Sequence, residues 1–258
     1  MAQPIWSGFL NFGLVSIPVR VFAAVKRHDI EFHLLHRKDL DRIHYEKVCP
    51  EHGEVDWAEV VRGYEYQKNK YAVIEESEFA KADVELTRSI NILDFIKFEE
   101  LSLLSFDHSY WITPEAAGAK AYFLLADVLA EEGKVAIAKV VLKLRQYVAI
   151  IRSEAGALVM TTMVFADEIR KPSEFGMSKK VEPTRSEREM AKQIVASMSV
   201  KFDAKNYKDE YREKLMSLVK AKISGRKIVA PKAPKKIAVK NIMEALKKSV
   251  RELERSKK

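Results

Sequence analysis

The sequence predicts a mixed β/α fold, with strands in the first half of the chain and helices toward its end. Three observations support this prediction. Residues 1 to about 110 mostly alternate apolar and polar side chains, as strands do. Residues 115–132 repeat apolar side chains at helical spacing. Amphipathic helical segments follow after residue 185.

The elements of the first half come in order. Residues 9–21 show a short-strand pattern interrupted by glycine, residues 64–74 alternate aromatic with polar side chains, and residues 88–98 alternate isoleucine with polar partners. A helix is predicted over residues 115–132, with Gly133 as its stop. One face of this helix carries the apolar side chains Tyr122, Leu125, Val128 and Leu129.

Strands return after this helix. Residues 134–151 are predicted as one long strand or two shorter ones, residues 153–156 as a turn, and residues 157–165 as the returning strand. Two amphipathic helices are predicted next. The first spans residues 188–198, with a capping box made by Ser186 and Glu189, and the second spans residues 204–223, with Asp203 as its N-cap.

Composition limits the partners. The 258 residues carry a formal net charge of +8, and the pI is about 9.3, which favours a polyanionic partner, either nucleic acid or an anionic membrane surface. No apolar run reaches the roughly 18 residues that a spanning helix needs, and the N-terminus lacks the pattern of a signal peptide. No membrane partner is therefore expected. Cys49 is the only cysteine, so a reducing cytoplasm is the simplest location.

The charge is concentrated at the C-terminal end. Residues 201–258 carry 19 basic and 7 acidic side chains, a net charge of +12, whereas the first 200 residues carry −4. Gly225, Pro231 and Pro234 argue against a helix over residues 224–239, which we predict to be a flexible basic linker that contacts phosphates without sequence choice. A solvated linker or a nucleoid-binding tail without a specific role is the alternative. The DNA-contact candidates here are Lys227, Lys232, Lys235 and Lys236.

A second basic segment spans residues 133–153, which hold five basic side chains and no acidic one. In a regular strand Lys139, Lys143 and Arg145 share one face with Tyr147, over about 20 Å. Such a strip matches the close spacing of DNA phosphates. A solvent-exposed face kept soluble by lysines is the alternative. Residues 20–47 are also rich in cations and histidines, but five carboxylates among them weaken a DNA interpretation.

Catalytic motifs are weak throughout. The chain has no phosphate-binding loop, no nucleophile elbow and no H-E-x-x-H motif. Cys49 and His52 have the two-residue gap of a zinc knuckle, yet structural zinc requires four ligands and only half of such a site is visible. An ordinary turn with a buried cysteine is the alternative. Cys49 and His52 are therefore weak metal candidates, and we expect neither a metal nor another cofactor.

A set of short runs, in order along the chain, resembles the prokaryotic Ku family. The runs are Ile-Trp-Ser-Gly at 5–8, Phe-Gly-Leu-Val-Ser-Ile-Pro-Val at 12–19, Phe-His-Leu-Leu-His at 32–36, Arg-Ile-His-Tyr-Glu-Lys-Val-Cys at 42–49, Gly-Tyr-Glu-Tyr at 63–66, Ile-Leu-Asp-Phe at 92–95, Gly-Lys-Val-Ala-Ile-Ala at 133–138 and Ala-Asp-Glu-Ile-Arg at 166–170. Tyr207, Asp209, Tyr211 and Arg212 close the match. The likeness covers residues 5 to about 222 and is more specific than any single motif.

The resemblance implies a Ku-type β-barrel core with an inserted bridge and a helical C-terminal arm, in a homodimeric ring with a cationic channel. Residues 1–222 would form this core, and residues 223–258 a basic linker with a short helix. Such a ring threads onto double-stranded DNA ends without sequence preference, because its contacts go to the sugar-phosphate backbone. The family protects and bridges the ends, is not an enzyme, and recruits an ATP-dependent end-joining DNA ligase in double-strand break repair. The expected location is the cytoplasm, with the nucleoid.

The resemblance also suggests which residues contact DNA and the ligase. From the barrel strands we carry over Lys134, Lys139, Lys143, Arg145 and Arg152, and from the early segment the bridge candidates Arg20, Arg37, Lys38, Arg42 and Lys47. A last helix over residues 242–255 places one apolar stripe, Ile242, Leu246, Val250 and Leu253, which could dock the ligase or pack back on the core. One departure concerns Cys49 and His52, because many bacterial relatives carry a C-x-x-C there.

Three other classes of protein can be compared with the sequence. A non-specific, nucleoid-type DNA-binding protein is the main alternative, since it needs only the basic tail. A sequence-specific regulator would need a recognition helix in a helix-turn-helix, and no convincing one is visible. A nuclease or ligase would need clustered acidic metal ligands or a nucleotide-binding lysine motif, and the sequence shows neither.

Overall fold

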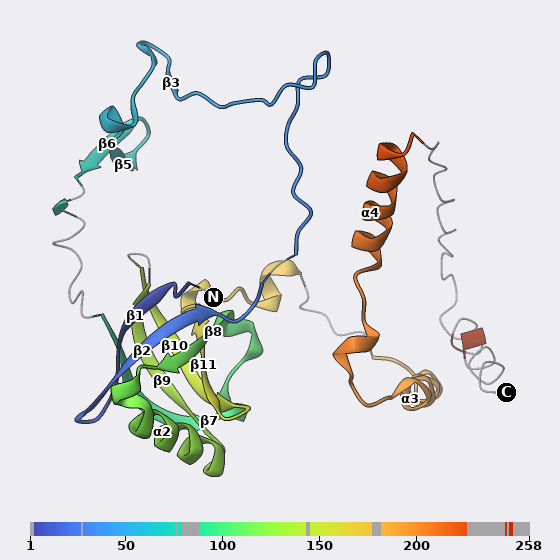
Figure 1. Ribbon diagram of the computed structural model, residues 1–258. Coiled ribbons are helices and arrows are strands. Elements are labelled where there is room, and N and C mark those ends of the chain that lie inside the picture. Colours follow the sequence, from blue (N-terminus) through green and yellow to red (C-terminus); the bar gives the residue numbers. More distant parts are fainter. Residues whose placement is uncertain are drawn as a thin grey trace. The chain divides into compact units, whose positions relative to one another are not determined.

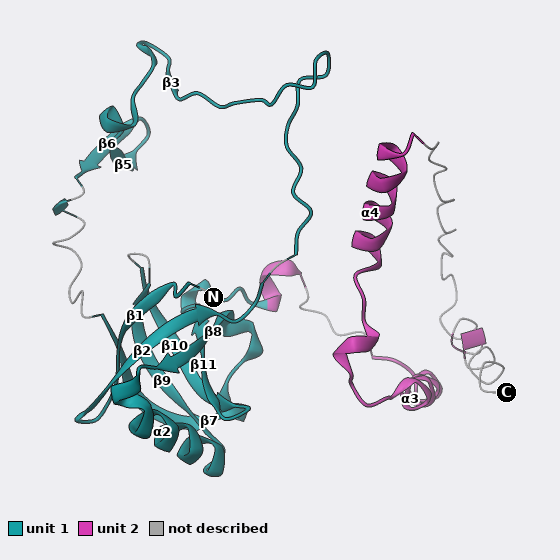
Figure 2. Ribbon diagram, viewed as in Figure 1, with its two compact units in different colours: residues 1–171 teal, residues 172–258 magenta. Residues whose placement is uncertain are grey.

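The computed structural model describes residues 3–26, 28–75, 77–78, 88–142, 145–176, 182–225, 246 and 248–249 (Figure 1). The chain divides into two compact units, residues 1–171 and residues 172–258, which are coloured separately in Figure 2. The functional division predicted at residue 222 stays a prediction.

The first unit is built on a closed barrel of seven strands. The strands are β1 (Trp6–Phe12), β2 (Val15–Ala23), β7 (Ser89–Lys97), β8 (Phe106–Pro114), β9 (Lys134–Leu142), β10 (Arg145–Glu154) and β11 (Ala157–Met163). They close in the order β1-β2-β8-β11-β10-β9-β7. Neighbours are antiparallel except β1 and β7, which pair in parallel with Leu10 opposite Ile90. The predicted β-barrel is confirmed, and the segment over residues 134–151 belongs to two antiparallel strands, the second of the two alternatives predicted.

The barrel interior is filled by one apolar face of each strand. Its buried members include Leu10, Val19, Val21, Ile90, Ile112, Ala138, Val140, Ala149, Ile151, Leu158 and Met160. Helix α2 (Ala119–Glu131) adds Tyr122, Leu125, Ala126 and Leu129 to the same core. Of the predicted apolar face, Tyr122, Leu125 and Leu129 are buried and Val128 is 44% exposed, and Ala126 is buried as well. Gly133 follows the helix with φ +61°, so it ends the helix as predicted.

A long insertion separates β2 from β7, and we call residues 24–88 the insertion. It holds the small hairpins β3 (Val48–Cys49) with β4 (Gly53–Glu54) and β5 (Arg62–Gln67) with β6 (Lys70–Ile74), and the short helix η1 (Trp57–Glu59). The prediction of mostly strands was wrong over residues 24–61, where β3 and β4 are only two residues each. No described residue of the insertion is buried, so this segment has no core of its own.

The second unit contains α3 (Arg185–Met198) and α4 (Glu210–Ile223). Helix α3 starts three residues earlier than predicted, because its capping box is made by Thr184 and Glu187 rather than by Ser186 and Glu189. The predicted helix over residues 204–223 is divided. Asp203 caps only the short η7 (Ala204–Asn206), and α4 starts after its own N-cap, Asp209.

The C-terminal predictions fall largely on residues that the structure does not describe. This holds for the basic linker and for most of the last helix, of which only residues 246, 248 and 249 are described. Among the helices described, none has the length and apolar character required to span a bilayer.

Candidate nucleic-acid interface

The cations of β9 and β10 do not form the single strip that a continuous strand would give. Lys139 belongs to β9 and Arg145 to its antiparallel neighbour β10, where Arg145 pairs with Leu142 while Lys139 pairs with Val148; residues 143–144 lie outside the described residues. Side chains directly opposite one another share a face of the sheet. Arg145 therefore lies on the side of Leu142, which belongs to the core, and Lys139 lies on the outer side. The predicted shared face was wrong because Lys139 and Arg145 belong to two antiparallel strands rather than to one continuous strand. The placement of Lys143 stays a prediction.

Three of the candidate cations lie on the outer side of the barrel. Arg20 alternates with the buried Val19 and Val21 on β2, Lys139 alternates with the buried Ala138 and Val140 on β9, and Arg152 lies opposite Val159 on β10. Lys139 and Arg152 come from adjacent strands but are separated by about four residues, roughly 13 Å along the sheet. The outer cations are therefore distributed around the barrel rather than aligned in one row.

Arg152 is the most heavily engaged of these cations. Its Nη2 and Nε donate to Glu154 Oε2 at 2.6 and 3.1 Å, and its Nη1 donates to Thr161 Oγ1 at 3.4 Å. The side chain is 30% exposed. All three guanidinium nitrogens therefore have partners on the sheet, which leaves Arg152 a weaker candidate for DNA contact than the open side chain of Lys139.

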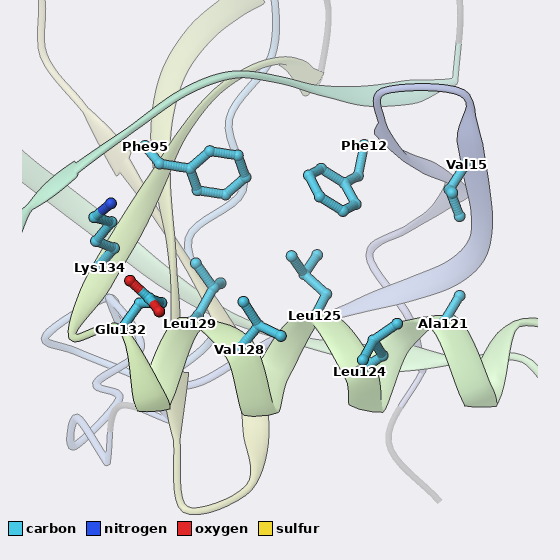
Figure 3. A pocket seen from close by; sticks show the side chains of 10 residues that line it. All are labelled: Phe12, Val15, Phe95, Ala121, Leu124, Leu125, Val128, Leu129, Glu132 and Lys134. Carbon is cyan, nitrogen blue, oxygen red and sulfur yellow. The ribbon is translucent and has the colours of Figure 1, made fainter.

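Lys134 lies near the helix end of the barrel, away from Arg145. It is at the rim of an apolar cavity of about 440 Å³ formed by α2, the β1–β2 turn and β7 (Figure 3). The rings of Phe12 and Phe95 meet edge-on at 5.7 Å there, above Leu125 and Leu129 of the helix. Because β9 spans nine residues, Lys134 is roughly 26 Å from the Arg145 end. It therefore lies at the opposite end of β9 from the residue that pairs with Arg145.

A polar cluster occupies the opposite end of the barrel. Arg145 Nη2 donates to Glu168 Oε1 at 2.7 Å, and its guanidinium carbon lies 5.2 Å from the centre of the Tyr147 ring. Glu168 Oε2 accepts from the backbone N–H of Phe165 at 2.8 Å. This backbone hydrogen bond, together with the Arg145 hydrogen bond, holds the pKa of Glu168 below its usual range.

Two more polar groups belong to this end cluster. The Asp107 carboxylate contacts the His108 ring at 2.6 Å, and partial burial is the main cause that raises the pKa of the nearby Tyr110 hydroxyl, with the Asp107 charge adding to it. The insertion leaves from this end as well, since Ala23, the last residue of β2, pairs with Tyr110 (Figure 1). Sequence reasoning found Arg145 but missed Glu168 as its partner. Only the two carboxylates in the Ala-Asp-Glu run at 166–168 hinted at it.

A tight loop of the insertion carries three of the bridge candidates. His36 N–H donates to Asp41 O at 2.8 Å, Leu40 N–H donates to His36 O at 2.9 Å, and Leu35 pairs with Arg42. The His36 ring lies 2.8 Å from the Asp39 carboxylate, which closes the turn and lowers the pKa of Asp39. This loop displays the exposed side chains of Arg37, Lys38 and Arg42.

Lys47 and Cys49 belong to a separate small module around β3 and β4. Lys47 Nζ lies 3.6 Å from the centre of the Trp57 ring, a cation–π contact, so this lysine helps to hold η1 against the hairpin. Cys49 Sγ lies 3.4 Å from His52 Nδ1. Within the described residues no third potential ligand joins them, so the weak zinc candidate has two of the four ligands that structural zinc requires.

The remaining candidates lie outside the described part of the chain. These are the tail cations Lys227, Lys232, Lys235 and Lys236 and the stripe residues Ile242, Val250 and Leu253. Leu246 of the stripe is described and half-buried. Their roles stay predictions.

The comparisons with known proteins agree with this arrangement. A family described as the Ku70/Ku80 beta-barrel domain matches residues 11–190. Many relatives carry the name non-homologous end joining protein Ku, and three of them illustrate the match. The one from Archaeoglobus fulgidus is 38% identical over 95% of this chain and 97% of its own length. The one from Coxiella burnetii is 38% identical over 100% of this chain and 97% of its own length. The one from Frankia casuarinae is 37% identical over 95% of this chain, which spans 62% of that protein.

Among solved structures, the SPOC domain of human PHD-finger protein 3 aligns with 62% of this chain and 95% of its own. The TM-score is 0.31 at 11% identity, too low to carry an argument.

Proposed function

Because the chain belongs to the Ku family, we propose that it binds double-stranded DNA ends without sequence preference and acts in their repair by non-homologous end joining. The observation that carries this proposal is a match along nearly the whole chain to relatives named for end joining. The closed barrel with a cation-bearing insertion supports it. We propose no catalytic step for the chain itself, because the function requires binding and protection of ends rather than chemistry on them.

A homodimeric ring is the proposed assembly. The insertion supports it, because several of its large apolar side chains are mostly exposed within the described structure: Phe32, Leu34, Trp57, Tyr64 and Tyr66 are 59–68% exposed. Among the described residues the β5–β6 hairpin pairs with no third strand, and an isolated two-stranded hairpin is marginally stable in water. A second copy of the insertion, related by a two-fold axis, would cover both exposed surfaces.

DNA contact is proposed through cations that would contact phosphates rather than base edges. On the barrel these are Arg20, Lys139 and Arg145, and on the insertion loop they are Arg37, Lys38 and Arg42. They come from four separate segments, so they can follow a phosphate backbone but cannot present a recognition helix to a groove. Contacts of this kind position a protein on DNA without reading sequence.

The basic tail and the apolar stripe after residue 240 are proposed to add DNA affinity and to recruit an ATP-dependent ligase, respectively. A stripe that packs back on the core is the alternative. The proposed location is the cytoplasm, in association with the nucleoid.

A competition experiment tests the function. A linear duplex and a closed circle of the same sequence compete for the full chain at fixed salt. Preference for the linear form supports end binding. Equal competition by the circle would instead support a non-specific DNA-binding protein led by the tail, a second candidate favoured by the net charge of +12 over residues 201–258.

A further inference from the structure

We propose that Glu168 is a positioning residue for Arg145, holding its guanidinium at the insertion end of the barrel so that the free N–H groups contact a DNA phosphate. This inference rests on the proposed function, since it names a residue pair that would serve DNA binding. It assigns to Glu168 a role that increases DNA affinity although its charge has the same sign as a phosphate.

The first argument is that the Glu168 carboxylate is itself fixed. One oxygen accepts from the Phe165 backbone N–H at 2.8 Å, which caps the short helix η5 (Ala166–Glu168) that follows β11. The other oxygen accepts from Arg145 Nη2 at 2.7 Å. Because the backbone hydrogen bond fixes the position of the carboxylate, its second oxygen has a defined position as well. The Arg145 side chain therefore takes the conformation that reaches this oxygen.

The second argument is that Arg145 is held but still open. The Tyr147 ring lies on one side, with its centre 5.2 Å from the guanidinium carbon, and Glu168 takes only one nitrogen. The Arg145 side chain is 54% exposed. An arginine has five N–H donors in a rigid fork, so most of them stay available, and fixing the fork in advance lowers the entropy cost of a bidentate phosphate contact.

Arg152 shows what a purely structural arginine looks like in the same barrel. All three of its nitrogens donate to Glu154 or Thr161, and it is only 30% exposed. The two arginines differ in their hydrogen bonds. Every guanidinium nitrogen of Arg152 donates to a side chain of the sheet, whereas Arg145 contacts Glu168 and Tyr147 and has no other hydrogen-bond partner among the described residues.

The opposite role for Glu168 would be a competitor that occupies Arg145 in place of a phosphate. A competitor is best served by a two-nitrogen, bidentate contact, which would block the fork. The observed contact uses one nitrogen and leaves the other edges open, so the geometry points to support rather than competition. The two roles predict opposite changes in affinity, which makes them separable.

The experiment measures the affinity of the full chain for a linear duplex, and its dependence on salt, in E168A, E168Q, R145A and the double variant. We expect E168A to weaken binding roughly three- to tenfold, although it removes a negative charge, and to lower the slope of log affinity against log salt by about one per subunit. The same loss is expected in R145A, and the double variant should be no weaker than R145A. E168Q should recover part of the affinity, because its amide oxygen can still accept from Arg145.

Asp167 supplies the matched control. It is the exposed neighbour of Glu168, and no contact of its side chain with Arg145 is present in the described structure. D167A removes the same charge one residue away, so it should leave affinity unchanged or slightly higher. R145K gives a second test that keeps the charge but loses the planar fork, and it too should weaken binding.

The proposal would be overturned if E168A bound DNA as tightly as the unmodified chain or more tightly, or, should E168A not fold, if R145K kept full affinity. Failure of the underlying function looks different. In that case the unmodified chain itself would not prefer a linear duplex over a circle, whatever happens at Glu168.

Discussion

The hydroxyl of Tyr122 bridges two barrel strands, and removing it should measurably destabilise the first unit. Tyr122 is 1% exposed, donates to Ile112 O of β8 at 2.6 Å and accepts from Leu158 N–H of β11 at 2.7 Å. Ile112 and Leu158 are opposite one another in the ladder, so the hydroxyl takes the place of a direct bond between the strands. Burial raises the pKa of this phenol, which keeps it protonated as a donor.

The magnitude follows from these two hydrogen bonds. A neutral hydrogen bond contributes about 1 kcal/mol net, and a buried group left without a partner costs about 1–3 kcal/mol. Tyr122→Phe leaves a buried carbonyl and a buried N–H, and part of that cost is recovered if the two strands close on each other. We expect a loss of about 2 kcal/mol in the free energy of unfolding.

Urea denaturation at fixed protein concentration measures this loss, since an oligomer makes apparent stability depend on concentration. Tyr110→Phe is the matched control. Tyr110 is half-buried on β8, and its hydroxyl makes no hydrogen bond within the described structure, so its loss should change stability by less than about 0.5 kcal/mol. Equal effects in the two variants would refute the reasoning that the bridging hydroxyl, rather than ring packing, links α2 to the strands.

Three further predictions concern the barrel seam, the end cluster and the outer face. A Cβ at Gly8 would overlap the carbonyl oxygen of Arg88, which accepts a hydrogen bond from the Phe9 backbone N–H beside the parallel pairing of β1 with β7. Gly8→Ala should therefore lower the unfolding free energy by about 1–3 kcal/mol in the same denaturation assay. The pKa of Glu168 is lowered, so its ion pair with Arg145 contributes fully to folding stability above the usual carboxyl pKa, and this contribution is lost as pH falls through the lowered pKa. The stability difference between the unmodified chain and E168Q should therefore shrink below about pH 4 in thermal melts. Lys139→Glu should weaken linear-duplex binding several-fold in a mobility-shift titration, whereas Lys134→Glu, at the helix end, should have a smaller effect; equal effects would contradict the proposed interface.

The barrel could be predicted where local signals determine structure. The alternation over residues 88–98 matched β7, the strand predicted over residues 157–165 matched β11, and Gly133 ended its helix, because each of these patterns is decided within a few residues. The capping boxes were less certain. The chain offers two similar Ser/Thr-x-x-Glu runs, starting at Thr184 and at Ser186, and the sequence alone does not show which of them caps the helix. In the structure the cap is Thr184.

For the candidate interface, the sequence could predict which cations it contains but not how they are arranged. The cations of residues 133–153 were found, but their faces were not, because alternation is exact only while the strand continues. Arg145 belongs to the next strand, β10, and lies on the opposite side of the sheet from Lys139. Its partner Glu168 is 23 residues away, and such a long-range pair leaves no local signature.

The insertion shows a different limit, and it ties the proposed dimer to the proposed DNA contact. A half-buried strand pattern predicts that one face meets a core, yet no described residue of the insertion is buried, so the apolar pattern points to a surface supplied by another molecule. The loop with Arg37, Lys38 and Arg42 lies within ten residues of Phe32 and Leu34, which are 65% and 61% exposed. If a second copy covers those apolar side chains, the same segment must be ordered by dimerisation before its cations are fixed for phosphate contact. DNA affinity and dimer stability are then thermodynamically linked, so a linear duplex should strengthen the dimer by the factor by which the dimer strengthens DNA binding.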